Sequence, residues 1–306
     1  MKKFTIQRWQ LKQRQSLPLN AKIKLSLSRI RNWYEYCKGN VYIAFSGGKD
    51  STVLLHLVRS LYPNTPAVFS DTGLEYPEIR EFVKTIPNVI WIKPEMNFKA
   101  VIEKYGYPII NKRVSYLLEI VRNPTDNNQN SRTLCLTGIN SSGKFNRSYK
   151  IPDKWMFLID APFKISSKCC DIMKKRPMNK FTRKNKIYPY IGSMACESYS
   201  RIYDYMRSGC NSFTKKTKRS TPLAFWNDQD IWDYIKTNNL PYCDIYNLGY
   251  SRTGCMFCMF GLHLDLYNRF DLMRITHLAQ YKYCMDKLGL RDVIAYIANG
   301  ISNPIN

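Results

Sequence analysis

The sequence lacks the features that would direct a protein into or across a membrane. Its 306 residues contain no run of about 18 consecutive apolar residues, so no segment is predicted to span a bilayer. Residues 1–8 are basic and carry no apolar stretch of the kind found in a signal peptide. We therefore expect a cytoplasmic protein without a membrane partner.

Acidic residues are scarce. The chain has 23 Asp and Glu against 47 Lys and Arg, which gives a net charge of +24. A charge this far from zero attracts polyanions over roughly one Debye length. Nucleic acid, either DNA or tRNA, is therefore the expected partner, and a solvated basic face is the alternative interpretation.

Internal repeats are absent, and apolar runs alternate with amphipathic stretches instead. The runs 41–45, 67–69 and 89–92 predict buried strands, and the stretches 52–61 and 76–86 predict the helices between them. This alternation is typical of parallel βαβ units. Five further elements are predicted: helices at 28–36, 228–237 and 272–297, and strands at 133–136 and 157–159.

The composition divides the chain into three predicted parts. Residues 1–38 form a basic helical lead-in, and 39–163 form an α/β core with a parallel sheet flanked by helices. Residues 164–306 form a basic, cysteine-containing helical portion that packs on the core. A dense basic segment, 164–219, carries interspersed aromatic residues: Tyr188, Tyr190, Tyr199, Tyr203 and Phe213.

A glycine-rich loop follows the first predicted strand and opens a helix. It reads Ser46-Gly47-Gly48-Lys49-Asp50-Ser51. Paired glycines let the backbone approach a phosphate closely, and the helix N-terminus offers free N–H groups and a partial positive charge. Lys49 adds a full charge, and the serines add hydroxyl groups. The spacing is not that of a Walker A loop. An unliganded Gly-Gly turn capped by serine is the alternative.

The loop and three later segments resemble one enzyme family. Ser46–Ser51 is similar to the PP-loop of ATP pyrophosphatases, which split ATP between the α and β phosphates. Residues 70–78, residues 192–201 and residues 221–226 are similar to the corresponding segments of the phosphoadenosine phosphosulfate (PAPS) reductase branch. The resemblance implies an adenine-nucleotide α-hydrolase-like fold. It also implies an ATP site that includes Asp71, Thr72, Gly73, Gly192 and Arg201 in addition to the loop.

Within this predicted site, Lys49, Asp50 and Asp71 are the candidate catalytic residues. A carboxylate at the end of a strand, as at Asp71, suits Mg²⁺ or a ribose hydroxyl, and a turn or helix cap is the alternative role. Arg201 and Glu197 are candidates for phosphate contact or for an ordinary helical ion pair. Where the family has an arginine two residues after the glycine that corresponds to Gly192, this chain has Met194.

Four of the ten cysteines have the spacing of a metal centre, namely Cys169, Cys170, Cys255 and Cys258. Adjacent cysteines suit separate irons better than one small ion, and the pattern resembles the [4Fe-4S] ligands of adenylylsulfate reductases. Zn²⁺ on the same sulfurs and free buried thiols are the alternatives. Cys196 and Cys210 are expected to be small core residues, with a sulfur-carrier role as the alternative for Cys210. The three histidines, His56, His263 and His277, lack ligand spacing and are expected to be structural.

These features favour an ATP pyrophosphatase that adenylates an acceptor, nucleic acid, for sulfur transfer that depends on an iron–sulfur cluster. A sulfur-donor protein and a homo-oligomer are consistent with this function. One alternative is a sulfonucleotide reductase that releases sulfite. The tail 299–306 lacks the nucleophilic cysteine of such enzymes, and no cysteine follows Cys284. A non-catalytic module that binds ATP and nucleic acid is the other alternative.

Overall fold

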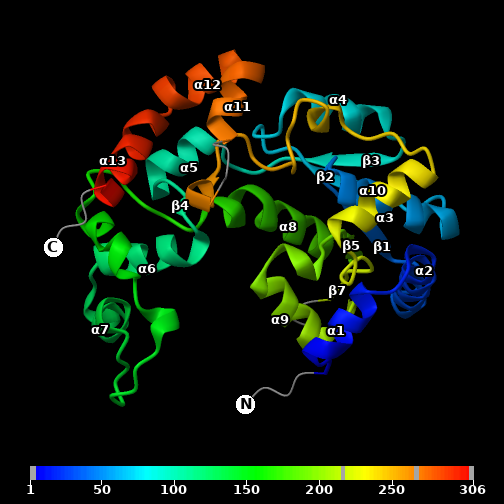
Figure 1. The fold of residues 1–306 in the computed structure, drawn as a ribbon, viewed down its shortest axis with the longest axis horizontal. Coiled ribbons are helices and arrows are strands. Elements are labelled where there is room, and N and C mark those ends of the chain that lie inside the picture. The colour runs from blue at the N-terminus through cyan, green and yellow to red at the C-terminus, as the bar shows by residue number, and fades with distance from the viewer. Residues whose placement is uncertain (1–4, 215–217, 265–268, 303–306) are drawn as a thin grey trace. The chain divides into compact units, whose positions relative to one another are not determined.

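The computed structural model describes residues 5–214, 218–264 and 269–302, so part of the predicted tail lies outside the described residues. The chain forms two compact units (Figure 1). Unit 1 comprises Met1–Asp71, Glu75–Lys93 and Pro177–Thr253. Unit 2 comprises Thr72–Leu74, Pro94–Arg176 and Gly254–Asn306. The predicted ranges 39–163 and 164–306 each contribute to both units.

Unit 1 contains a six-stranded sheet in the order β3-β2-β1-β5-β7-β6. All neighbouring strands pair in parallel except β6 and β7, which are antiparallel. The predicted α/β fold with a parallel sheet is confirmed. The strands are β1 (Val41–Phe45), β2 (Ala67–Ser70), β3 (Val89–Ile92), β5 (Tyr188–Ile191), β6 (Asn211–Ser212) and β7 (Arg219–Ser220).

The helices of unit 1 flank this sheet, and α3 shows why they form. Val53, Leu54, Leu57 and Val58 recur at helical spacing, and all four are buried. The helix begins at Lys49, three residues earlier than the apolar stripe predicts. The helices are α1 (Arg8–Gln15), α2 (Leu19–Tyr36), α3 (Lys49–Leu61), α4 (Pro77–Thr85), α8 (Arg176–Asn185), η5 (Ala195–Glu197), α9 (Tyr199–Ser208), α10 (Asp228–Thr237) and η6 (Asp244–Tyr246).

The basic lead-in is part of the core of unit 1. In α2, Ile30 and Trp33 are fully buried. On the same helix Lys22 is 2% exposed, and its ammonium donates to both carboxylate oxygens of Asp230 at 2.8 and 2.7 Å. This buried ion pair ties α2 to the first turn of α10. The lead-in therefore helps to fix the position of α10.

Unit 2 is mainly helical and contains one short parallel strand pair, β4 with β8. Its helices include two π-helical segments, η4 and η8. The elements are α5 (Phe98–Tyr105), β4 (Ile109–Ile110), α6 (Lys112–Arg122), η1 (Asp126–Asn128), α7 (Gln129–Thr137), η2 (Arg147–Tyr149), η3 (Asp153–Asp160), η4 (Asp171–Lys175), β8 (Met259–Phe260), η7 (Leu262–Leu264), α11 (Arg269–Thr276), α12 (Leu278–Lys282), η8 (Tyr283–Lys287) and α13 (Leu290–Ser302).

Two predicted strands are wrong. Residues 133–136 lie inside α7, which ends where Gly138 adopts a left-handed conformation. Residues 157–159 lie inside the 3₁₀ helix η3, where Trp155 and Leu158 are buried three residues apart on one face. The strand that extends the sheet on the other side of β1 is β5, which lies within the basic segment 164–219.

The last predicted helix, 272–297, is interrupted. It is divided among α11, α12, η8 and α13, and Gly289 at φ +69° separates the last two. Among the helices that the described residues form, none combines the length and apolar character needed to cross a membrane.

Candidate functional site

The sheet of unit 1 reverses its strand order at β1. From β1 the chain proceeds outward to β2 and β3, and it later returns to the other side of β1 as β5. In open α/β sheets, ligands bind beyond the carboxyl ends of the strands at such a switch point. The segments that follow β1 and β5 are Ser46–Ser51, called here the nucleotide loop, and Gly192–Glu197.

Three glycines allow close backbone packing at this point. Gly47 has φ +72°, and a Cβ there would lie 2.7 Å from Ile79 Cγ2. A Cβ on Gly48 would overlap the Thr253 hydroxyl, and one on Gly192 would lie 3.1 Å from the Asp50 carbonyl oxygen. Glycine at these positions therefore lets the segment after β5 and residues 246–253 approach the nucleotide loop.

Hydroxyl groups hold the nucleotide loop in place. The Ser51 hydroxyl donates to the Gly48 carbonyl oxygen at 2.8 Å and accepts from the Ser46 backbone N–H at 3.2 Å. The Lys49 backbone N–H, one of the first of α3, donates to the Tyr246 hydroxyl at 2.9 Å. This N–H lies at the positive end of a helix, where an anion binds well. The Tyr246 hydroxyl thus lies where the helix offers an anion site.

The charge of Lys49 is held between carboxylates. Its Nζ lies 2.7 Å from Asp228 Oδ1 and 3.3 Å from Asp50 Oδ1, and the side chain is 5% exposed. Burial by itself would lower the pKa of Lys49, but the hydrogen bond to Asp228 and the charge of Asp50 raise it overall. Lys49 therefore stays cationic at neutral pH, as an interaction with phosphate requires.

Asp50 and Arg201 also lie near each other. Burial raises the pKa of Asp50, and the nearby charges of Lys49 and Arg201 partly offset this rise. Burial lowers the pKa of Arg201, and the charge of Asp50 opposes this. Arg201 also pairs with Glu197, one turn earlier. Arg201 therefore makes a local ion pair with a residue that precedes α9, and it also lies near Asp50 of the nucleotide loop.

Asp71 directly follows β2 in unit 1 and is buried at 5% exposure. Its carboxylate accepts from Arg80 at 3.1 Å. Thr72 and Gly73 belong to unit 2, where the Thr72 hydroxyl accepts from the Leu74 backbone N–H at 3.2 Å. Within unit 1 the structure thus brings together the nucleotide loop, Gly192 and Arg201.

Sequence reasoning missed three residues beside the nucleotide loop: Asp228, Tyr246 and Thr253. Asp228 is the first residue of a correctly predicted helix. Acidic residues are common in the first turn of a helix, so this position does not by itself indicate a functional site. Tyr246 and Thr253 lie about 200 residues from the loop in sequence, and only the fold brings them to Lys49 and Gly48.

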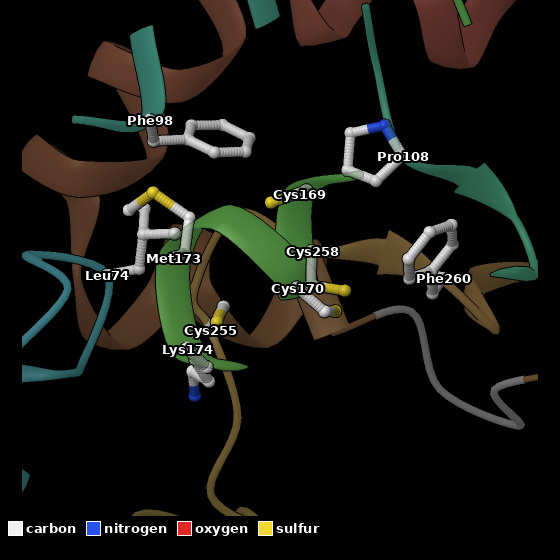
Figure 2. A pocket seen from close by; sticks show the side chains of 10 residues that line it. All are labelled: Leu74, Phe98, Pro108, Cys169, Cys170, Met173, Lys174, Cys255, Cys258 and Phe260. Atoms are coloured by element: carbon white, nitrogen blue, oxygen red, sulfur yellow. The ribbon is translucent and has the colours of Figure 1, made fainter. Parts of the chain in front are cut away.

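The four predicted metal-binding cysteines line one cavity in unit 2, called here the cysteine pocket (Figure 2). Cys169 and Cys170 begin the helical segment that continues through η4, whereas Cys255 and Cys258 precede β8. The Met256 backbone N–H donates to the Leu74 carbonyl oxygen at 2.7 Å and fixes the second pair. The other lining residues are Leu74, Phe98, Pro108, Met173, Lys174 and Phe260.

The chemistry of this pocket suits a thiolate-bound metal centre. Burial raises the pKa of Cys169 above its usual range, and the thiols of Cys170, Cys255 and Cys258 raise it further. Burial likewise raises the pKa of Cys258. Four thiols in one apolar cavity are the donor set that zinc and iron–sulfur clusters use, and a bound cation would favour their thiolate forms.

The space within the pocket is small. It measures about 10 Å³, close to the room that one water molecule needs. Within the described ranges, no three Cys, His, Asp or Glu side chains are arranged to hold a metal ion. The four thiols are the right ligands for a cluster. Their side chains would have to move apart to make room for one.

The remaining cysteines and histidines differ in their surroundings. Cys210 is buried as predicted, and burial raises its pKa to about 12, which disfavours a sulfur-carrier thiolate at neutral pH. Cys196 was expected to be in the core but is exposed, because it lies in the turn η5 after β5. His56 Nδ1 lies 2.8 Å from the Tyr234 hydroxyl, which is a structural contact.

The switch point, the glycine-rich loop and the start of α3 define an α/β fold of the PP-loop type. Residues 40–122 and 127–260 match the phosphoadenosine phosphosulfate reductase domain. The chain therefore belongs to the PAPS reductase family, as the sequence motifs predicted.

The chain is similar to several proteins of different length. An uncharacterised protein of Methanocaldococcus jannaschii is 26% identical over 252 residues, which are 79% of this chain and 47% of that protein. The chain thus spans about half the length of this relative. An adenosine 5'-phosphosulfate reductase of a Geobacillus species is 25% identical over 260 residues, which are 83% of this chain and 88% of the reductase. The crystal structure of a PAPS reductase from Candida auris aligns with a TM-score of 0.44 at 14% identity, covering 82% of this chain and 96% of the other.

Proposed function

We propose that this protein is an ATP pyrophosphatase that adenylates an acceptor in a nucleic acid and prepares it for sulfur transfer. The observation that carries the proposal is the nucleotide loop. Lys49 is buried, remains cationic and lies at the N-terminus of α3 between two carboxylates. This arrangement is suited to bind a polyphosphate and to stabilise pyrophosphate as it leaves.

The chemistry requires one bond to form and one to break. An acceptor oxygen attacks the α-phosphorus of ATP, and the bond between the α-phosphorus and the bridging oxygen to the β-phosphorus breaks. Pyrophosphate leaves with the electron pair. The acceptor oxygen then departs with AMP when a sulfur nucleophile replaces it.

The residues of unit 1 have distinct roles in this proposal. Lys49 and the first N–H groups of α3 bind the departing phosphates, and Arg201 contributes a second positive charge. Asp50 and Asp71 would hold Mg²⁺, which carboxylates bind well. The remaining residues of unit 1 proposed for ATP contact are Ser46, Gly47, Gly48, Ser51 and Gly192. Thr72 and Gly73, which the family resemblance also assigns to ATP contact, belong to unit 2.

Cys169, Cys170, Cys255 and Cys258 would hold a [4Fe-4S] cluster, with Zn²⁺ on the same sulfurs as the alternative. A cluster in this pocket would supply sulfur or electron-transfer chemistry that protein side chains lack. Lys174 lines the same cavity and would offset negative charge there. A cytoplasmic location, a sulfur-donor protein and a homo-oligomer complete the proposal.

A sulfonucleotide reductase is the second candidate. It is favoured by the similarity to proteins named adenosine 5'-phosphosulfate reductase. In that reaction the nucleotide loop would bind the substrate's phosphates without releasing pyrophosphate. A third candidate, a module that binds ATP without turnover, would show ATP binding and neither product.

Pyrophosphate release distinguishes these candidates. Protein purified without oxygen should release pyrophosphate from ATP slowly alone and faster when either tRNA or DNA is added. The nucleic acid that stimulates release identifies the acceptor class. Sulfite release from a sulfonucleotide with a thiol donor, without any pyrophosphate from ATP, would reject the proposal in favour of the reductase.

A further inference from the structure

The helix α9 exposes two aromatic rings and a cation on one face. Tyr199 is 71% exposed and Tyr203 is 50% exposed, and Arg207 is also exposed. These residues are four apart, so they lie one above another along the helix. We call them the α9 stripe. Tyr205 lies on the opposite face of α9 and is buried in the core of unit 1.

The helix α1 lies beside α9 (Figure 1). The Ile6 backbone N–H donates to the Met206 carbonyl oxygen at 2.9 Å, and Arg14 Nη1 donates to the Tyr205 hydroxyl at 2.6 Å. The Thr5 hydroxyl donates to the Arg207 carbonyl oxygen at 2.7 Å. These contacts hold α1 and the two residues Thr5 and Ile6 before it against α9.

The helix α1 adds the same kinds of side chain. Trp9 is 63% exposed, and Arg8 and Lys12 on the same helix are exposed. Its first turn contains no acidic residue. Exposed tryptophan is uncommon on a surface with no partner, because burying its ring is strongly favourable. Aromatic rings interspersed with cations favour a ligand that has both flat bases and negative charge.

The helix α9 also carries Arg201, which interacts electrostatically with Asp50 of the nucleotide loop. Arg201 is two residues from both Tyr199 and Tyr203, so it projects from the other side of α9. All of these residues belong to unit 1. The helix therefore presents the stripe on one side and a residue of the candidate ATP site on the other.

We infer that α1 and α9 bind unpaired nucleotides of the nucleic-acid acceptor, with bases stacked on the aromatic rings and phosphates beside the arginine and lysine side chains. This inference rests on the proposed function for its choice of a nucleic acid. The net charge of +24 gives the charge complementarity that a polyanion requires. Duplex bases are already stacked on one another, whereas unpaired bases are free to stack on protein rings.

Of the five aromatic residues in the basic segment, Tyr188, Tyr190 and Phe213 pack within unit 1. Tyr188 meets Trp33 edge-on, and Lys218 lies over its ring. Tyr190 is fully buried, and its hydroxyl donates to the Ile30 carbonyl oxygen at 2.8 Å, so it cannot stack on a base. Phe213 is 46% exposed but packs against Trp33 and Tyr36. Tyr199 and Tyr203 are the two that a helix presents in a row.

Fluorescence anisotropy with a labelled single strand of about 20 nucleotides tests the inference. The double variant Tyr199→Ala/Tyr203→Ala should bind the strand roughly tenfold more weakly or worse, because each lost stacking contact has a large effect. Tyr199→Phe/Tyr203→Phe should bind like the wild type, because stacking needs the ring and not the hydroxyl. Tyr116→Ala removes a tyrosine that is 53% exposed on α6 of unit 2 and should have no effect.

A salt titration tests the cation. Arg207→Gln should reduce the dependence of log affinity on log salt concentration by about one unit, because one phosphate contact is lost. Lys84→Gln removes an equal charge from α4, where Lys84 pairs with Glu81, and should leave the slope unchanged. An unchanged slope for Arg207→Gln would remove this residue from the binding surface.

The outcomes separate this inference from the proposed function. Full binding by the alanine double variant, or tighter binding of a duplex than of the single strand, overturns the inference and leaves the proposed function standing. Failure of the wild type to bind either form overturns both. Retained ATP binding shows that the double variant is folded. A change from dimer to monomer in light scattering would assign the α9 stripe to self-association and overturn the inference.

Discussion

The nucleotide loop and the cysteine pocket differ in how their side chains are prepared for a ligand. At the nucleotide loop, the polar groups are already held in position. Neighbouring segments pack closely on its glycines, Ser51 hydrogen-bonds to the loop backbone, and Lys49 makes ion pairs. In the pocket, four thiols from two segments line one cavity that holds about 10 Å³. The comparison indicates that the first site is set by the fold, whereas the second would be completed by what it binds.

The comparison predicts that each site is altered by its own variants alone. A variant of the nucleotide loop should change ATP chemistry and leave the iron content unchanged. A variant of the cysteine pocket should change the metal content and leave ATP binding unchanged. A variant that changes both properties without unfolding would show that the sites are coupled.

The largest effect is expected for Lys49→Ala. Pyrophosphate release should fall by about a hundredfold or more, because a charge that stabilises the leaving group in a buried site is lost. Asp50→Ala should also abolish release. The matched control is Lys84→Ala, since Lys84 is exposed on the same unit. Equal rates for wild type and Lys49→Ala would contradict the role of the loop.

A large effect on metal content is expected for Cys255→Ser. Protein purified without oxygen should lose its bound iron and brown colour, because a cluster loses one of its four thiolate ligands. Cys210→Ser, which changes a buried thiol outside the pocket, should keep both. Iron analysis and absorption spectra measure the result. Persistence of iron in the Cys255 variant would refute the four-cysteine site, and stoichiometric zinc in the wild type would replace the cluster.

A substantial loss of stability is expected for Lys22→Met. The change leaves the buried carboxylate of Asp230 without its partner, which typically costs about 3–5 kcal/mol. Urea unfolding measures the loss. The double variant Lys22→Met/Asp230→Asn should recover part of it, because no uncompensated charge remains. A double variant no more stable than the single one would show that the charge is not the cause.

The smallest effect is expected for Gly192→Ala. The added Cβ would lie 3.1 Å from the Asp50 carbonyl oxygen, so the nucleotide loop must shift slightly and ATP affinity should fall several-fold. Gly254→Ala is the control, because a Cβ there meets nothing within 4 Å. Titration with ATP gives both affinities. Identical affinities for the two variants would mean that the close approach at Gly192 is unimportant for binding.

The sequence predicted the first half of the sheet well because each strand there is a short apolar run between turn residues. Val41–Phe45 and Val89–Ile92 have no competing helical pattern. It failed at β5, where Tyr188 and Tyr190 suggested a ligand surface rather than a strand. The strand predicted at 157–159 is also wrong, because the buried residues Trp155 and Leu158 follow the three-residue period of a 3₁₀ helix.

The candidate sites were predictable to different degrees. The loop Ser46–Ser51 is contiguous, so its residues are found from one stretch of sequence. Asp228, Tyr246 and Thr253 come from distant segments, and a single sequence contains no signal that brings them to Lys49. The spacing of the cysteines indicated that they share a site, but it did not indicate how little space the pocket has.

The most direct test of the central claim is which bond of ATP is broken. Phosphorus-31 NMR of ATP incubated without oxygen with the protein and the stimulating nucleic acid distinguishes the products. We predict AMP-linked product and pyrophosphate, both absent with Lys49→Ala. Formation of ADP and inorganic phosphate, or no change in ATP while a sulfonucleotide yields sulfite, would contradict the account.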